Sequence, residues 1–275
     1  MSKSFALALS GGGARGLAHI AIFEALDELG RKPVAIAGSS MGSLFGAAYA
    51  AGMAAKDIRR FVLTLTHDRA EVFRRLIASR ASTVASLFNL GFGSAALVDA
   101  EKFCKEFMPT EVPEEFDQLT IPLMVMATDL HRREQVELSQ GALRPALAAS
   151  IALPTVMRPV VIGDRVLIDG AASNPLPFDR LRQRADVIVA VDLSGEPALE
   201  RRDIPNPWEC LVTTVLVMGG AITAEKMRQA APDLMVKPNV SLFRALDFLQ
   251  ASAIIRAAQP AKAELKGKLK TLLED

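Results

Sequence analysis

The sequence predicts an α/β fold in which a mainly parallel central sheet is flanked by helices in three layers, α/β/α. Short apolar runs alternate with longer segments of helical periodicity, and strands separated by helices favour parallel pairing. Half of the 275 residues are hydrophobic, which is enough for a large core. No repeat, linker or break in composition divides the chain, so we expect one domain over residues 1–275, with a core over about 5–257 and a C-terminal helix over about 258–275.

The first predicted elements flank a cluster of glycines. Residues 5–9 are an apolar run typical of a buried strand, and residues 14–29 place apolar side chains on one helical face until Gly30 ends the helix. A second strand and helix are predicted at 34–37 and 43–51. Further expected elements are polar helical segments between 55 and 115, strands at 121–128, 186–193 and 233–237, and a hairpin of 160–162 with 165–168.

Charge and cysteine content exclude several classes of protein. The 32 basic and 31 acidic residues leave a formal net charge of +1, which gives no electrostatic basis for binding nucleic acid. Cys104 and Cys210 are too few for a disulfide framework, which favours a reducing compartment. The first residues have no signal-peptide pattern, so we expect a cytoplasmic protein.

Two uncharged windows, 33–55 and 210–224, need to be considered as membrane spans. A glycine-bounded turn at 38–42 divides the first window into a short strand and one helix, and the second has only 15 residues, three of them threonine. Each continuous piece is too short to cross a hydrocarbon core of about 30 Å. We therefore predict no transmembrane segment and interpret both windows as buried core.

The first motif is the sequence GGGARG at residues 11–16, between the first strand and the first helix. A dinucleotide site would need an acidic residue about 20 positions further on, and a phosphate-binding P-loop would need a closing Gly-Lys-Ser/Thr; neither is present. Adjacent glycines at a helix N-terminus do let backbone N–H groups approach an oxygen of a ligand. The alternative is a tight structural turn, which would not need three consecutive glycines.

The second motif is the sequence GSSMG at residues 38–42, again between a strand and a helix. It fits the G-x-S-x-G nucleophile elbow, in which glycines relieve crowding at a strained turn that presents a serine hydroxyl. Ser40 is the candidate nucleophile because only this serine has glycines two positions away on both sides. Ser39 and Ser43 are the alternatives.

The order of residues along the chain does not favour a histidine as the base for Ser40. In α/β-hydrolases the histidine follows the serine and the acid, and here no histidine follows His131. His19 is expected to be a packed or partly exposed helix residue, and His67 and His131 lie in polar stretches typical of a surface. Taken alone, Asp169 at the end of a predicted strand would be interpreted as a turn former. Combined with an elbow that has no suitable histidine, it predicts a Ser–Asp dyad. Because an ordinary Asp is a poor base at neutral pH, an apolar, water-poor site would have to raise the basicity of Asp169.

Taken together and in this order, residues 11–16, 38–42 and 169–171 resemble the patatin-like phospholipase family, in particular compact bacterial members similar to the catalytic domain of neuropathy target esterase. Each motif alone is common, whereas the three combined are specific. The similarity covers about 5–257, although Ala171 stands where many members have glycine. Supporting similarity comes from residues 127–130, 149–154 and 174–177.

The resemblance implies a serine hydrolase, without metal or cofactor, that cleaves acyl ester bonds of phospholipids or lysophospholipids through an acyl-enzyme intermediate. Carried over by position, Ser40 is the nucleophile and Asp169 its proton acceptor, and backbone N–H groups of the glycine loop form the oxyanion hole. Arg15 braces that loop or faces a lipid phosphate. The oxyanion residues are Gly11, Gly12, Gly13 and Ala14, and the supporting residues are Arg15, Gly16, Gly38, Gly42 and Gly170.

Two alternative functions remain open. A general carboxylesterase would use the same residues on a simpler ester, and a catalytically silent regulatory protein would have the same fold. A silent protein would be free to lose Ser40 or Asp169, and both are present.

A lipid substrate requires access from a lipid surface, and two stretches are candidates for peripheral membrane contact. Residues 86–93 are apolar and contain glycine, so they either line the acyl site or pack in a corner of the fold. Residues 261–273 place Leu265, Leu269 and Leu272 on one helical face near several lysines. For this helix we favour ordinary packing over membrane binding. Nothing in the sequence predicts an oligomeric state.

Overall fold

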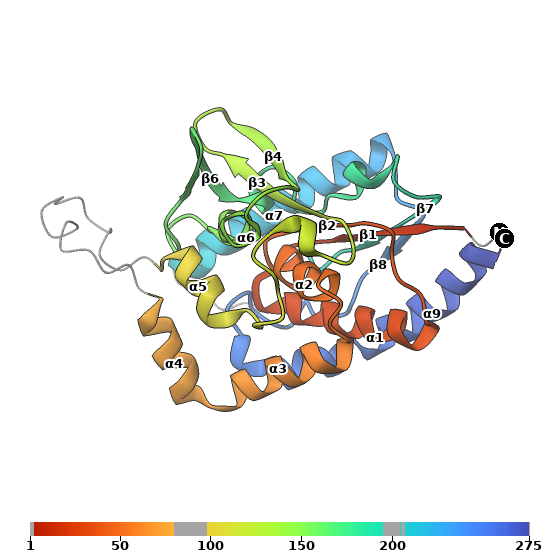
Figure 1. The fold of residues 1–275 in the computed structure, drawn as a ribbon, viewed down its shortest axis with the longest axis horizontal. Coiled ribbons are helices and arrows are strands. Elements are labelled where there is room, and N and C mark those ends of the chain that lie inside the picture. The colour runs from red at the N-terminus through yellow and green to blue at the C-terminus, as the bar shows by residue number, and fades with distance from the viewer. Residues whose placement is uncertain (1–2, 80–97, 195–203, 205–206, 275) are drawn as a thin grey trace, which may run out of the picture.

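The computed structural model describes residues 3–79, 98–194, 204 and 207–274, and one mixed sheet runs through its centre (Figure 1). Its eight strands are β1 (Phe5–Leu9), β2 (Ile36–Ser39), β3 (Leu123–Asp129), β4 (Glu134–Leu138), β5 (Val160–Ile162), β6 (Arg165–Asp169), β7 (Val187–Val191) and β8 (Leu234–Val236). The order β3-β2-β1-β7-β8 is parallel, whereas β4 and β6 pair antiparallel with β3, and β5 with β6. The predicted α/β class with a mainly parallel sheet is confirmed.

Alternation along β1 divides the core into two parts, one on each face of the sheet. Phe5, Leu7 and Leu9 belong to the larger part, and Ala6 and Ala8 to the smaller one. The larger core lies under α1 (His19–Leu29), α2 (Met41–Ala50), α6 (Leu143–Ile151), α8 (Ala251–Ala257) and α9 (Gln259–Glu274), and the smaller under η6 (Phe178–Leu181) and the end of α7 (Pro207–Gln229). Small side chains on the second face let these elements approach the sheet closely.

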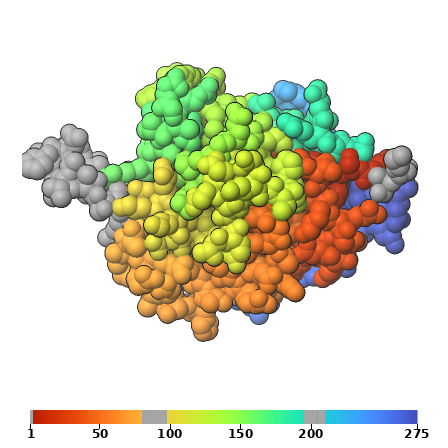
Figure 2. All heavy atoms as spheres, viewed as in Figure 1, coloured from red at the N-terminus to blue at the C-terminus, as the bar shows by residue number. Residues whose placement is uncertain are grey.

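The remaining helices lie around this core. In the space-filling view, α3 and α4, in orange, form much of one surface together with the yellow α5 (Figure 2). The bounds are η1 (Gly13–Ala18), α3 (Ala55–His67), α4 (Arg69–Ala78), α5 (Ala100–Phe107), η4 (Phe116–Gln118), η5 (Gly170–Ala172) and η7 (Phe248–Gln250).

Most predicted elements are present with shifted ends. The predicted helix over 14–29 is divided into η1, a 3₁₀ segment, and α1, which ends at Gly30 with φ 62° as a left-handed cap. β2 begins two residues later than predicted and continues up to Ser39, next to the elbow. β4 was not predicted, because only Val136 of its five residues is buried and the strand resembles a polar loop in sequence.

The prediction for residues 210–224 was wrong, because α7 is not a buried core helix. Only 6% of its most apolar 18-residue window is buried, although β2 and α2 within 33–55 are buried as predicted. By length and composition, Cys210–Gln229 is also the one helix of the described chain that would be able to cross a membrane. Val212, Gly219 and Thr223 nevertheless lie against the body of the protein. An apolar helical sequence does not indicate how much of its surface the protein itself covers.

The packed-helix interpretation of the C-terminal segment is confirmed. Leu265 and Leu269 of α9 are completely buried against the core that includes α1, and Leu273 rather than Leu272 completes the buried face. Lys266 forms an ion pair with Glu28 of α1 at 2.8 Å. The leucine face is therefore not available to a membrane in this structure. The other candidate for membrane contact, residues 86–93, lies outside the described residues.

Candidate active site

β2 and α2 are joined at Ser40 by a turn that is strained for any residue with a side chain. Ser40 has φ 51° and ψ −127°, a conformation that costs free energy and persists only where the surroundings enforce it. A Cβ atom on Gly38 would lie 2.7 Å from the backbone of Gly42, and one on Gly42 would collide with the carbonyl oxygen of Leu9. The glycines on either side therefore permit the close approach that the elbow requires.

Each polar atom of Ser40 has a partner. Its hydroxyl donates to Asp169 Oδ2 at 2.8 Å, its N–H donates to Ser150 Oγ at 2.9 Å, and its carbonyl accepts from Ser43 Oγ at 2.6 Å. Ser39 Oγ is buried without a partner in the described chain. Of the three serines considered from sequence, only Ser40 meets Asp169.

The pairing of β3 explains why two residues 129 positions apart meet. β4 pairs with β3 along residues 125–129 and occupies one edge of it, so β2 and β6 share the other edge. On that edge Ser39 is opposite Met126, and Asp169 is opposite Ala127. The end of parallel β2 and the end of antiparallel β6 thus arrive at neighbouring positions, and the residue after β2 is Ser40.

Asp169 is held in place from several directions. Its Oδ1 accepts the N–H of Ala171 at 2.8 Å, its carbonyl accepts the hydroxyl of Thr128 at 2.9 Å, and its own N–H donates to the carbonyl of Ala152 at 3.0 Å. Burial raises the pKa of Asp169 to about 6, and the hydrogen bonds from Ala171 and Ser40 counteract only part of this effect. The carboxylate therefore has the raised basicity that a neutral-pH base needs.

The glycine loop lies beside Ser40 but has fewer available N–H groups than predicted. A Cβ atom on Gly11 would lie 3.0 Å from Ser40 Cβ. The N–H of Gly11 already donates to the carbonyl of Pro175 at 3.2 Å, and that of Ala14 to the carbonyl of Ala245 at 2.7 Å. Gly12 and Gly13 have no such partner among the described residues. Of the four predicted oxyanion donors, these two therefore have N–H groups that no described carbonyl occupies.

Arg15 braces the loop rather than facing solvent. Its Nη1 donates to the carbonyl of Ser194 at 2.8 Å, just beyond the end of β7. Burial lowers the pKa of Arg15, and the nearby charge of Asp192 offsets this only in part. The contact ties the glycine loop to the neighbouring strand, which is the first of the two roles considered for this residue.

Gly16 and Gly170 are sites of close packing around the elbow. A Cβ atom on Gly16 would lie 2.6 Å from Met41 Cβ, at the first turn of α2. A Cβ atom on Gly170 would collide with the carbonyl oxygen of Met126. Both glycines therefore let their segments lie directly against the elements that carry Ser40 and Asp169.

None of the three histidines is hydrogen-bonded to Ser40. His19 is completely buried, its Nε2 lies 3.0 Å from the carbonyl oxygen of Ser10, and burial lowers its pKa to about 4. Its ring is therefore neutral near pH 7 and bonded elsewhere. His67 and His131 are exposed, as predicted.

Sequence reasoning missed Ser150, which accepts the N–H of the strained residue Ser40 from the neighbouring helix α6. This serine lies in the stretch 149–154, which was noted for family similarity. Nothing in its residue type distinguishes it from other small helix residues, and its role depends on where α6 packs.

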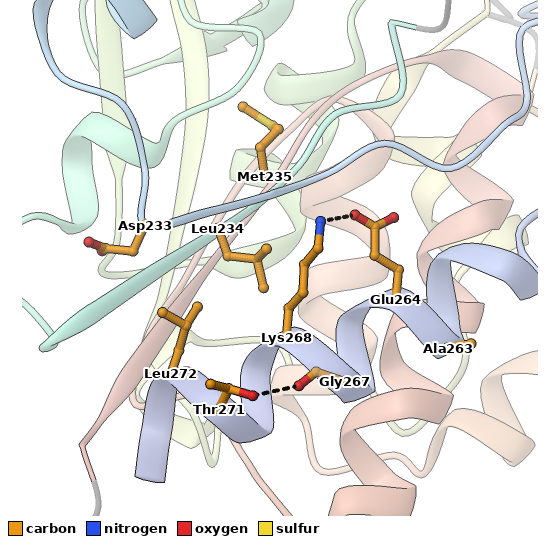
Figure 3. A pocket seen from close by; sticks show the side chains of 9 residues that line it. All are labelled: Asp233, Leu234, Met235, Ala263, Glu264, Gly267, Lys268, Thr271 and Leu272. Carbon is orange, nitrogen blue, oxygen red and sulfur yellow. Dashed lines mark hydrogen bonds and ion pairs between the residues drawn. The ribbon is translucent and has the colours of Figure 1, made fainter. Parts of the chain in front are cut away.

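One concavity of the described chain lies away from this site. A groove of about 760 Å³ lies between β8 and α9, where Lys268 and Glu264 form an ion pair (Figure 3). None of its lining residues belongs to the glycine loop, the elbow or the Asp169 turn. A much smaller cavity, of about 30 Å³, lies between Gly11, Ala171 and α7. Within the described residues no three His, Cys, Asp or Glu side chains are grouped so as to hold a metal.

Comparison with solved structures supports the fold. VipD from Legionella pneumophila has a TM-score of 0.53 at 14% identity, covering 98% of this chain and 67% of that one. Human GIVD cytosolic phospholipase A2 has a TM-score of 0.50 at 11% identity, covering 99% and 60%. At such identities the likeness concerns the fold alone.

Sequence relatives and a family model identify the family. An uncharacterized NTE family protein of Mycobacterium tuberculosis is 36% identical over 207 residues, 74% of this chain and 53% of that protein. Lysophospholipase NTE1 of Coccidioides immitis is 26% identical over 291 residues, 98% of this chain but 18% of that protein. The chain thus spans about half or less of the length of these relatives. The model described as Patatin-like phospholipase matches residues 7–182, well over half of the chain, and this protein therefore belongs to the patatin-like phospholipase family, with relatives among the NTE proteins.

Proposed function

We propose that this protein hydrolyses acyl ester bonds of phospholipids or lysophospholipids, with Ser40 as nucleophile and Asp169 as general base. The observation that carries the proposal is the 2.8 Å hydrogen bond from Ser40 Oγ to Asp169 Oδ2 at a strained elbow. Membership of the patatin-like phospholipase family and a relative named as a lysophospholipase support the class of substrate.

In the acylation step, Ser40 Oγ attacks the carbonyl carbon of the ester while its proton passes to Asp169 Oδ2. The carbonyl oxygen becomes an oxyanion, which the N–H groups of Gly12 and Gly13 stabilise together with the positive end of the α2 helix dipole. Asp169 then returns the proton to the leaving alcohol as the ester C–O bond breaks. The products are the free alcohol and an acyl ester on Ser40.

Deacylation repeats these roles with water. Asp169 accepts a proton from the attacking water, the second oxyanion forms at the same two N–H groups, and the proton is delivered to Ser40 Oγ as the acyl–oxygen bond breaks. A fatty acid is released, and the starting hydrogen bond is restored. An Asp with an ordinary pKa is a poor base at neutral pH, so the raised pKa of Asp169 suits both steps.

The proposal is tested by analysing products with mass spectrometry. Wild-type protein is incubated with phosphatidylcholine, lysophosphatidylcholine or p-nitrophenyl butyrate, and an aliquot treated beforehand with a fluorophosphonate serves as the matched control. We expect fatty acid release from at least one of the two lipids, blocked by the inhibitor. Hydrolysis of the nitrophenyl ester alone would make the protein a general carboxylesterase, and no hydrolysis with no labelling would leave a silent protein.

Activity is expected to depend on the ionisation of Asp169. Because the pKa of this carboxyl is raised to about 6, it is protonated at pH 5 and is then unable to accept the serine proton. We expect kcat/KM for a soluble ester to rise with pH, reach half of its maximum near pH 6 and level off above pH 7. A pH–rate profile measures this directly.

The matched control for the pH profile is a double variant, His67→Gln with His131→Gln, which removes both exposed histidines. His19 does not titrate near pH 6, because its pKa is about 4. The midpoint should therefore stay in place in the double variant. A midpoint that moves or disappears there would assign the acidic limb to a histidine.

Removal of metal ions is expected to leave turnover unchanged. The proposed steps use only the serine hydroxyl, the aspartate carboxylate and backbone N–H groups. Initial rates with and without EDTA test this expectation, and a loss of activity that calcium restores would contradict it.

A further inference from the structure

We propose that the outward face of α7 docks this protein on the surface of a lipid bilayer beside the catalytic site. This inference rests on the proposed function. α7 passes along the side of the sheet opposite α1 and α2, in cyan to blue in Figure 1. We define the docking face as the exposed side of α7 between residues 210 and 224.

The composition of the docking face is unusual for a helix in contact with water. No charged residue occurs between Cys210 and Ala224, and Val217 and Met218 are 67% and 60% exposed. On the rest of the helix, charged residues are Glu209, directly before this stretch, and those from Glu225 onward. A helix that is apolar on both sides is normally covered on both sides, and here the protein covers only one.

The docking face lies next to the candidate active site. The inward side of α7 packs on η5, the turn that follows Asp169, and Gly219 lies against Pro175. Val215 and Leu216 line the small cavity whose other walls include Gly11, where an added Cβ atom would lie 3.0 Å from Ser40 Cβ. A bilayer in contact with α7 would therefore lie at the rim of the site.

A second exposed apolar group flanks the glycine loop from another segment. Leu242 and Leu246 are 80% and 58% exposed, and the carbonyl of Ala245 between them accepts the N–H of Ala14. This segment follows α7 in the chain and contacts the glycine loop, whereas α7 contacts η5. Exposed apolar side chains therefore occur on both segments that contact elements of the site, and such side chains are a feature of interaction surfaces.

The size of the docking face favours a membrane over a second protein chain. Fifteen residues of helix are about 22 Å long, and one helix is about 10 Å wide, which gives about 220 Å². A stable protein interface needs about 800 Å² from each partner. A single amphipathic or apolar helix is in contrast sufficient for interfacial binding, because its side chains enter the boundary between head groups and acyl chains.

The inward contacts of α7 also indicate that it lies on the bilayer and does not span it. Val212, Gly219 and Thr223 are buried against the protein, and Lys226 in the last turns bonds to Asp179 at 2.6 Å. A spanning helix would have to give up these contacts. A helix lying in the interface keeps them and places its charged C-terminal turn among head groups and water.

The test is flotation of the full chain with phosphatidylcholine vesicles, carried out on the Ser40→Ala protein so that lipid is not consumed. Adding Val217→Glu should lower the vesicle-bound to free ratio at least about 10-fold, because it removes an inserted apolar group and adds a charge. Met218→Glu should act in the same way. The matched control is Val34→Glu, the same change at an exposed valine ahead of β2, at the opposite end of that strand from Ser40, and it should bind like the parent.

Activity separates failure of this proposal from failure of the proposed function. In the protein with Ser40 intact, Val217→Glu should leave hydrolysis of p-nitrophenyl butyrate unchanged and lower hydrolysis of vesicle lipid by the same factor as binding. Vesicle binding that depends on Val217, in a protein that hydrolyses no ester, would support docking and overturn the catalytic proposal. Binding by Val217→Glu equal to the parent, or a dimer of the parent that Val217→Glu dissociates, would overturn docking.

Discussion

Asp169→Asn is expected to lower the turnover of ester substrates at least about 100-fold, which is the scale of removing a general base. Asparagine has nearly the same shape, and its amide oxygen is able to keep the bond that Asp169 Oδ1 accepts from Ala171. Its NH₂ group, however, would face Ser40 Oγ as a donor where the carboxylate now accepts at 2.8 Å. The serine proton would then have no acceptor. Steady-state kinetics on a soluble ester measure the effect.

Thermal unfolding distinguishes this loss of activity from a loss of fold. Burial raises the pKa of Asp169 from its ordinary value of 3.8 to about 6, so the folded state binds the proton more tightly than the unfolded state. The stability gained from this proton is complete below pH 3.8 and is lost as the pH rises through 6, so the ionised carboxylate disfavours folding by roughly 3 kcal/mol at pH 8. Asp169→Asn removes this cost, and its Tm at pH 8 should be at least that of the wild type.

The matched control is Asp164→Asn, in the hairpin turn between β5 and β6. Asp164 is exposed and pairs with Arg132, so the same substitution there should leave turnover unchanged. Near-normal activity of Asp169→Asn, in a protein whose control behaves as expected, would remove Asp169 from the mechanism.

The parts of this protein that could be predicted from sequence are those set by neighbouring residues. β1, the left-handed cap at Gly30 and the hairpin around Gly163 depend on local patterns, and the structure contains all three. The elbow belongs to the same class. The backbone of Gly42 leaves no room for a side chain at residue 38, and that of Leu9 leaves none at residue 42. The two glycines of the G-x-S-x-G pattern meet this requirement.

The features that could not be predicted depend on tertiary contacts. The pairing of Ser40 with Asp169 was predicted from the lack of a suitable histidine and from the family resemblance. The geometry that unites them, with β2 and β6 sharing one edge of β3, is specified by no local pattern. The sequence likewise cannot tell that the N–H groups of Gly11 and Ala14 are used by other carbonyls.

The error for α7 has a related cause. Hydrophobicity measures how poorly a side chain is solvated by water, and both a protein core and a lipid surface relieve that cost. Residues 210–224 satisfied the criteria for a buried helix, yet most of this helix is exposed. Composition therefore identified α7 as apolar enough to be buried, but could not predict that the protein leaves most of it uncovered.

Ser40→Ala is expected to abolish covalent labelling by a fluorophosphonate and to lower ester turnover at least about 10⁴-fold, because nothing else at the elbow is placed to form the acyl-enzyme. Ser43 Oγ donates to the carbonyl of Ser40, and Ser39 Oγ has no hydrogen-bond partner within the described chain. Labelling followed by intact-mass measurement tests the expectation.

Ser39→Ala is the control for this variant, since it removes the neighbouring hydroxyl, which is buried and makes no hydrogen bond to another described residue. It should keep both labelling and turnover, because only the Ser40 hydroxyl is hydrogen-bonded to a buried carboxylate of raised pKa. Labelling that persists in Ser40→Ala and disappears in Ser39→Ala would move the nucleophile by one residue. The elbow would then have to present the side chain of Ser39, which is buried in this structure. The glycines two positions before and after residue 40 would no longer be explained by the need to present a nucleophile at that residue.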